Sequence, residues 1–123
     1  MLRRQLRLGA FIMATGHHVA AWRHPGSQVD SGINIDHYIE VAQTAERGLF
    51  DQVFVADSPG LWHKGDEESL SRQGRVSHFE PVTLWAALSA VTRHIGFVAT
   101  ASTTYEDPYL LARKFASLDH LSK

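Results

Sequence analysis

The sequence of 123 residues contains no cysteine, and its 12 Lys and Arg residues nearly balance its 13 Asp and Glu residues. Without cysteine the chain has no disulfide framework and no thiolate nucleophile. A formal net charge of -1 gives no basic surface for nucleic acid or for an anionic membrane. With 20% charged and 10% aromatic residues, the composition is also too apolar for a disordered chain.

Long hydrophobic runs are absent as well. A basic start over residues 1–8 leads into an apolar run that breaks at residues 15–18, and this run is too short and too polar for a signal peptide or a membrane span. The length fits one modest domain. We therefore predict a cytoplasmic protein with neither a membrane nor a nucleic acid as partner.

Three short apolar runs, spaced by roughly forty-five residues, predict β-strands at 6–13, 52–57 and 95–104. A helical pattern follows each run, at 36–48, 81–93 and 108–121. Asn34 or Asp36 is expected to cap the first helix, Gly48 to lie near its end, and Asp107 with Pro108 to start the third. The resulting βαβαβα order predicts an α/β fold with parallel strands and right-handed crossovers.

Two long connections, residues 14–33 and 57–80, follow the first two strands. Long loops in a compact domain usually carry function, and the carboxyl edge of a parallel sheet is where ligands bind. Asp57 ends the second strand at this edge. Its carboxylate could accept hydrogen bonds from a ligand, or the residue could equally form part of a turn. In the third strand, one face would carry the hydroxyl groups of Thr100, Ser102 and Thr104, which could bond a ligand. The alternative is that threonine is there because it favours strands.

Five histidines in these loops, His17, His18, His24, His63 and His78, raise the question of a metal site. Their spacing matches no metal-binding motif, so we favour histidines that line a polar pocket and could transfer protons near neutral pH. The glycine-rich fingerprints of dinucleotide-binding folds and P-loops are missing.

Five segments occur in an order and spacing that resemble the N-terminal part of flavin-dependent monooxygenases of the bacterial luciferase-like superfamily. The most similar branch is that of nitrilotriacetate, dibenzothiophene-sulfone and long-chain alkane monooxygenases. The segments are W-R-H-P at 22–25, A-E-R-G at 45–48, F-V-A-D at 54–57, S-T-T-Y-E-D-P-Y at 102–109 and A-S-L-D-H-L-S at 116–122.

The resemblance implies a (β/α)8 TIM-type barrel and an oxidoreductase that uses reduced FMN and O2 to oxygenate a small organic substrate. A separate NAD(P)H:flavin reductase supplies the reduced FMN in such systems; homo-oligomerisation stays open. By position, Asp57 and Thr100 match flavin contacts, with Ser102 and Thr104 as weaker candidates. His17 and Trp22 match the loop that walls the substrate pocket. From the histidine spacing we expect no metal, and no catalytic residue is assigned.

Length separates this chain from that family. A (β/α)8 barrel takes roughly 200 residues or more, so we expect residues 1–123 to form the first three units of one barrel domain, without strands four to eight. On this interpretation the chain is a partial sequence, the product of a truncated gene or one piece of a split protein. The alternative to monooxygenase activity is an inactive fragment, or a module that needs a partner chain.

Overall fold

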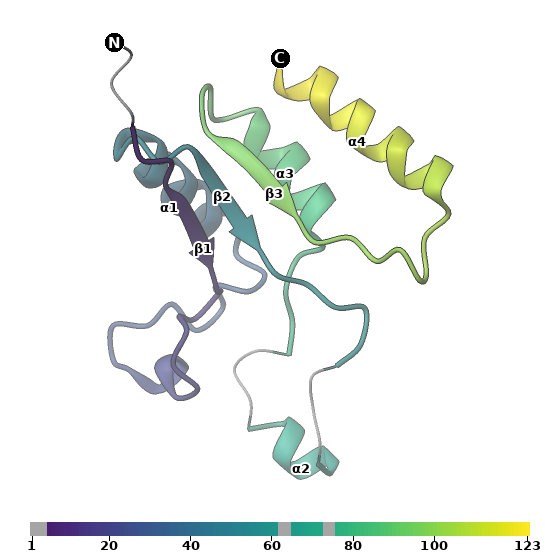
Figure 1. Cartoon of the computed structure of the whole chain (residues 1–123). Coiled ribbons are helices and arrows are strands. Elements are labelled where there is room, and N and C mark those ends of the chain that lie inside the picture. The colour runs from purple at the N-terminus through teal and green to yellow at the C-terminus, as the bar shows by residue number, and fades with distance from the viewer. Residues whose placement is uncertain (1–4, 62–64, 73–75) are drawn as a thin grey trace.

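The computed structural model describes residues 5–61, 65–72 and 76–123. Three parallel strands, β1 (Gly9–Ile12), β2 (Gln52–Val55) and β3 (Gly96–Ala99), form one sheet in the order β1-β2-β3 (Figure 1). Their first residues, Gly9, Gln52 and Gly96, lie opposite one another across the sheet. The predicted α/β order and parallel pairing are thus confirmed.

The strands are shorter than the sequence predicted, and β3 is the clearest case. It ends at Ala99 rather than at residue 104, because the following residues turn, with the Thr104 N–H donating to Ser102 Oγ at 3.3 Å. A side-chain acceptor of this kind competes with the hydrogen bonds of a sheet. Residues 100–104 therefore do not continue the strand. The prediction that Thr100, Ser102 and Thr104 lie on one face of it is wrong for that reason.

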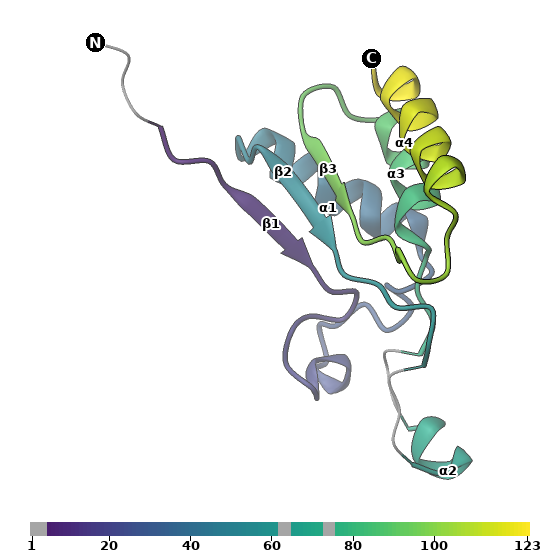
Figure 2. The ribbon, with the colours of Figure 1, turned by 45° about the vertical axis from the view of Figure 1, so that its right-hand side comes forward.

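The three predicted helices are α1 (Ile35–Arg47), α3 (Pro81–Ser89) and α4 (Pro108–Ser122). All three lie on one face of the sheet, and α4 packs beside α3 (Figure 2). The 3-10 helix η1 (Ala21–Arg23) and the four-residue helix α2 (Glu67–Leu70) lie in the two long loops and were not predicted. No helix within the described residues is long and apolar enough to cross a membrane.

Capping groups explain where the long helices begin. Asn34 Oδ1 accepts hydrogen bonds from the N–H groups of Asp36 and His37, which settles the choice between the two predicted caps. Asp107 caps α4 ahead of Pro108, as predicted, and Glu80 caps α3 ahead of Pro81. Each cap satisfies N–H groups that the helix leaves without an internal partner.

The core lies between the sheet and the helices. Val53 from β2 and Trp85 and Leu88 from α3 are completely buried there, and the Trp85 ring stacks on Phe97 of β3 with 5.0 Å between centroids. The opposite face of the sheet is apolar yet open. On it Phe11 is 44% exposed and Val98 is 36% exposed.

Glu46 ties α1 to the turn that precedes β3. Its Oε1 atom accepts three backbone hydrogen bonds, at 2.7 Å from Arg93, 2.6 Å from His94 and 3.1 Å from Ile95. These N–H groups, led by that of His94, lower the pKa of Glu46 below its ordinary value. α3 ends at Ser89 instead of extending to residue 93, because the N–H groups of Ala90 and Val91 bond to carbonyl oxygens three residues back and that of Arg93 bonds to Glu46.

Candidate functional site

The connections that follow β1, β2 and β3 all leave the sheet at its carboxyl edge (Figure 1). Parallel pairing brings about this arrangement, since strands that run in the same direction end on the same side. Two cavities lie in this region. We call them the Asp57 cavity and the Phe11 cavity.

The Asp57 cavity has a volume of about 520 Å³ and lies where the chain leaves β2 and β3. It contains three of the predicted site residues, Asp57, Thr100 and Ser102. Four of its other lining residues were not predicted as members of the site: His78, Glu80, Tyr105 and Glu106.

The Asp57 carboxylate is held by His78. The imidazole Nε2–H donates to Asp57 Oδ1 at 2.7 Å, and the two side chains are 19% and 36% exposed for Asp57 and His78 respectively. A hydrogen bond to an ionised acceptor at this distance is of the strong, charge-assisted kind. The pair therefore joins the end of β2 to the end of the long loop before α3.

Thr100 and Ser102 contribute hydroxyl groups to the same cavity. Thr100 Oγ1 donates to the Val55 carbonyl oxygen at 3.1 Å, which fixes the hydroxyl and leaves its lone pairs as acceptors. Ser102 Oγ accepts from the Thr104 N–H and so keeps its own proton for another acceptor. Thr104 is exposed and does not line the cavity.

The residues around His78 are packed against the loop that precedes α1. The Phe79 N–H donates to the Gly32 carbonyl oxygen at 3.1 Å, and the Phe79 ring meets the Tyr38 ring edge-on at 5.9 Å. Ser77 lies so close to Gly32 that a β-carbon there would overlap the Ser77 carbonyl oxygen. Any side chain at position 32 would therefore force these two segments apart.

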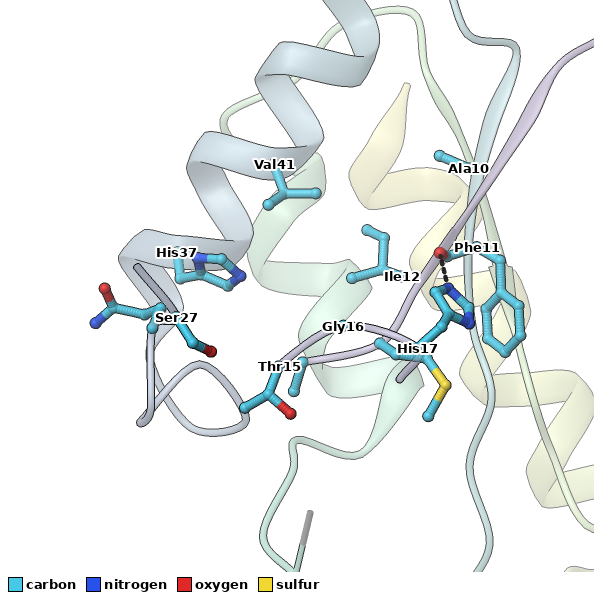
Figure 3. Close-up of a pocket in the computed structure, with 12 residues that line it drawn as sticks. Ala10, Phe11, Ile12, Thr15, Gly16, His17, Ser27, His37 and Val41 are labelled. Atoms are coloured by element: carbon cyan, nitrogen blue, oxygen red, sulfur yellow. Dashed lines mark hydrogen bonds between the residues drawn. The ribbon is translucent and has the colours of Figure 1, made fainter. Parts of the chain in front are cut away.

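The Phe11 cavity, of about 390 Å³, lies between β1, the loop after it and α1 (Figure 3). His17 Nε2–H donates to the Phe11 carbonyl oxygen at 3.0 Å, while His37 and Thr15 border the same space from other sides. The Thr15 hydroxyl is buried, and it has no hydrogen-bond partner within the described part of the chain.

The predicted pocket residues His17 and Trp22 do not share a cavity. His17 lines the Phe11 cavity, whereas Trp22 lines neither of the two and has the Arg23 guanidinium 5.0 Å from its ring centroid. His24 is used within its own turn, where Nδ1 accepts from the Gly26 N–H. His63 lies outside the described residues. Across 5–61, 65–72 and 76–123, no three His, Asp or Glu side chains gather in a way that could hold a metal ion.

A family model described as luciferase-like monooxygenase matches residues 11–123. Among curated proteins, N-acetyl-S-(2-succino)cysteine monooxygenase of Bacillus subtilis is 51% identical over 98% of this chain and 26% of its own length. Nitrilotriacetate monooxygenase component A of Aminobacter aminovorans is 42% identical, over 97% of this chain and 28% of its own. The chain thus spans about a quarter of the length of these relatives.

Solved structures share the fold of this quarter. The crystal structure of DmoA from Hyphomicrobium sulfonivorans matches with a TM-score of 0.85 and 38% identity, over 98% of this chain and 27% of that one. Riboflavin lyase RcaE, solved with modified FMN and riboflavin, matches with a TM-score of 0.83 and 36% identity, over 97% and 28%.

Proposed function

This chain belongs to the luciferase-like monooxygenase family, and we propose that it supplies the flavin-binding first three units of a (β/α)8 barrel that oxygenates a small organic substrate. The cofactor would be reduced FMN, delivered by a separate NAD(P)H:flavin reductase. When bound, reduced FMN supplies the electrons that allow O2 to react with the substrate.

The observation that carries this proposal is the Asp57 cavity. It lies at the carboxyl edge of parallel strands, where barrels bind their ligands. Asp57 and Thr100, the two positions that the family resemblance matches to flavin contacts, both line it. Two residues that are far apart in the sequence thus face one space of about 520 Å³.

The chemistry of the lining residues fits the part of FMN that carries N–H and hydroxyl groups. Carboxylates line the cavity, whereas His78 is the one basic side chain among its described lining residues. A carboxylate accepts hydrogen bonds from N–H and O–H donors but repels a phosphate. Asp57 and Thr100 would therefore hold the ring and sugar-alcohol portion, and the phosphate would bind on later barrel units, where such barrels commonly hold it.

The structure has room for the remaining barrel units. The open face of the sheet carries Phe11, Phe54 and Val98, and β1 and β3 each have an outer edge without a neighbouring strand among the described residues. Uncovered apolar faces and strand edges of this kind ordinarily pair with further structure. Strands four to eight, which relatives four times as long have room for, would cover them.

Substrate choice would depend partly on the loop after β1. We propose that His17 and Trp22 belong to the wall of the substrate pocket, with Trp22 brought to it by packing in the full barrel. Relatives are named for substrates as different as nitrilotriacetate, dimethyl sulfide and long-chain alkanes. This range leaves a small organic molecule as the substrate class.

The 123 residues alone are expected to be inactive. Three of the eight βα units would leave the flavin ring exposed to water, whereas a closed active site excludes water. Without the phosphate site, the loss of two or three charge-assisted hydrogen bonds would weaken binding by about a hundredfold or more. The second candidate function follows from this: a module that becomes active only with a partner chain.

A chimera tests the proposal directly. Residues 1–123 would replace the matching first quarter of the Bacillus subtilis relative, with which they share 51% identity. We expect the chimera, given FMN and a flavin reductase, to take up oxygen in a substrate-dependent way, and the isolated chain to show no such uptake. A folded chimera that binds no flavin would reject the site. Micromolar flavin binding with coupled product formation by the isolated chain would instead make it a complete enzyme.

A further inference from the structure

We propose that His78 is a positioning residue for the flavin site: it holds Asp57 through Oδ1 so that Oδ2 is presented to a hydrogen-bond donor of the ligand. This inference rests on the proposed flavin site and extends it to a residue that carries no assigned role. The distance from His78 Nε2 to Asp57 Oδ1 is 2.7 Å. Within the described residues, His78 is the one hydrogen-bond partner of the Asp57 side chain.

Other carboxylates of the cavity are already engaged. Glu80 uses Oε1 to accept from the Val82 N–H at 2.9 Å and Oε2 to accept from the Thr83 N–H at 2.8 Å. Both oxygens of Glu106 accept from Lys114 Nζ, each at 2.9 Å. Among the described residues that line the cavity, Oδ2 of Asp57 is therefore the carboxylate oxygen that accepts no hydrogen bond, and it is the acceptor most open to a ligand.

A side-chain carboxylate rotates readily unless something fixes it, because its terminal torsion is broad. The bond from His78 occupies one oxygen and so restricts that rotation. Holding an acceptor in place before binding lowers the entropy cost of binding, which raises affinity without a new contact.

His78 is itself held on both sides. Ser77 is packed against Gly32, and Phe79 is fixed by its N–H bond to the Gly32 carbonyl and by its ring contact with Tyr38. The loop before α1 therefore determines where the imidazole lies. Through His78, the loops after β1 and β2 together position one acceptor of the cavity.

The first arm of the test needs no ligand and uses the whole 123-residue chain. Long-range 1H–15N NMR of the imidazoles should show His78 with a protonated, slowly exchanging Nε2, a signature that His78 loses in Asp57→Ala. His120, an exposed histidine on α4, provides the internal reference and should not change. An unchanged His78 signal in Asp57→Ala would overturn the inference.

The second arm measures FMN binding to the same chain by NMR shift titration up to millimolar FMN. We expect Asp57→Ala to weaken binding by about tenfold or more, since it removes one charged hydrogen bond, and His78→Leu by about threefold, since it removes only the positioning of that acceptor. The double variant should bind no more weakly than Asp57→Ala, because His78 acts through Asp57. His78→Gln, whose amide nitrogen reaches the same position, should restore most of the affinity, and His120→Leu should bind like the wild type.

Losses that simply add in the double variant would overturn the inference, as would failure of His78→Gln to restore binding. A wild-type chain that keeps the His78 signature but shows no shift with FMN at Asp57 or Thr100 would reject the proposed flavin site instead. The two failures are thus distinguishable.

Discussion

The carbonyl oxygen of Ser77 fills the space that a β-carbon of Gly32 would need. This close approach places the last residues of the loop after β2 against the residues just before α1. His78, the next residue along the chain, reaches Asp57 from there. A glycine with no functional group of its own therefore contributes to the geometry of the Asp57 cavity.

Gly32→Ala should destabilise the chain by about 1–3 kcal/mol, the usual cost of forcing extra atoms into a packed site. The obstacle is backbone, which cannot swing aside as a flexible side chain would. Gly60→Ala is the matched control, since a β-carbon there would meet only Ser58 Oγ at 3.9 Å. Urea denaturation measures both, and equal midpoints for the two variants would contradict the prediction.

Glu46 should make folding stability sensitive to acid. Its pKa is lowered in the folded state, chiefly by the N–H of His94, so its contribution is complete above the ordinary value of 4.5 and is lost as pH falls through the lowered pKa. Glu46→Gln should cost about 1–2 kcal/mol near neutral pH and flatten the decline in acid.

The control for Glu46 is Glu40→Gln, on an exposed position of the same helix. This variant should retain both the stability and the acid dependence of the wild type. Thermal unfolding followed from pH 7 into the acid range separates the two variants. A pH profile of Glu46→Gln that parallels the wild type would show that the three N–H bonds do not stabilise the fold.

Two substitutions of Trp85 test how much of the stability of the core comes from the packing of its ring. Trp85→Ala removes a completely buried ring that stacks on Phe97 and should cost about 3–5 kcal/mol. Trp85→Phe should cost less, because the phenyl ring keeps part of the packing and the indole N–H, buried without a hydrogen-bond partner among the described residues, takes no hydrogen bond with it. Chemical denaturation compares the two; similar losses would mean that a phenyl ring does not replace the packing of the indole.

Thr100→Val tests whether the hydroxyl at the end of β3 serves the ligand as well as the fold. Loss of the bond to the Val55 carbonyl should reduce stability by about 1 kcal/mol. Flavin affinity of the chimera should fall by about fivefold, since a lone-pair acceptor disappears from the cavity. Thr103→Val, on an exposed neighbouring position, should change neither quantity. Loss of stability with unchanged flavin affinity would restrict Thr100 to a structural role.

The sequence predicted the elements best where local chemistry determines them. Asp107 followed by Pro108 marked the start of α4, and the apolar runs marked three strands in the correct order. The end of β3 was wrong because the bond from Thr104 N–H to Ser102 Oγ depends on a turn that strand preference does not reveal.

For the candidate site, topology was predictable and side-chain pairing was not. Parallel strands bring Asp57 and Thr100 to one edge whatever their side chains do, so their common cavity followed from the strand order. The bond between Asp57 and His78 spans 21 residues of a long loop, and no periodicity or motif predicts which residue of such a loop returns to the sheet. Trp22 was assigned by its position in a family motif; its ring has the Arg23 guanidinium 5.0 Å from its centroid, and its place in the pocket wall stays a prediction.

The strands stand in the sheet in the same order as in the chain, and this has a consequence for biosynthesis. Each new strand needs only the strand made just before it as a template, so the sheet can extend as the polypeptide leaves the ribosome. Among β1, β2 and β3 no strand has to wait for a distant one, and contacts between nearby segments form fastest. Residues 1–123 would then be a growing edge during translation, on which any later strand of the same chain could assemble.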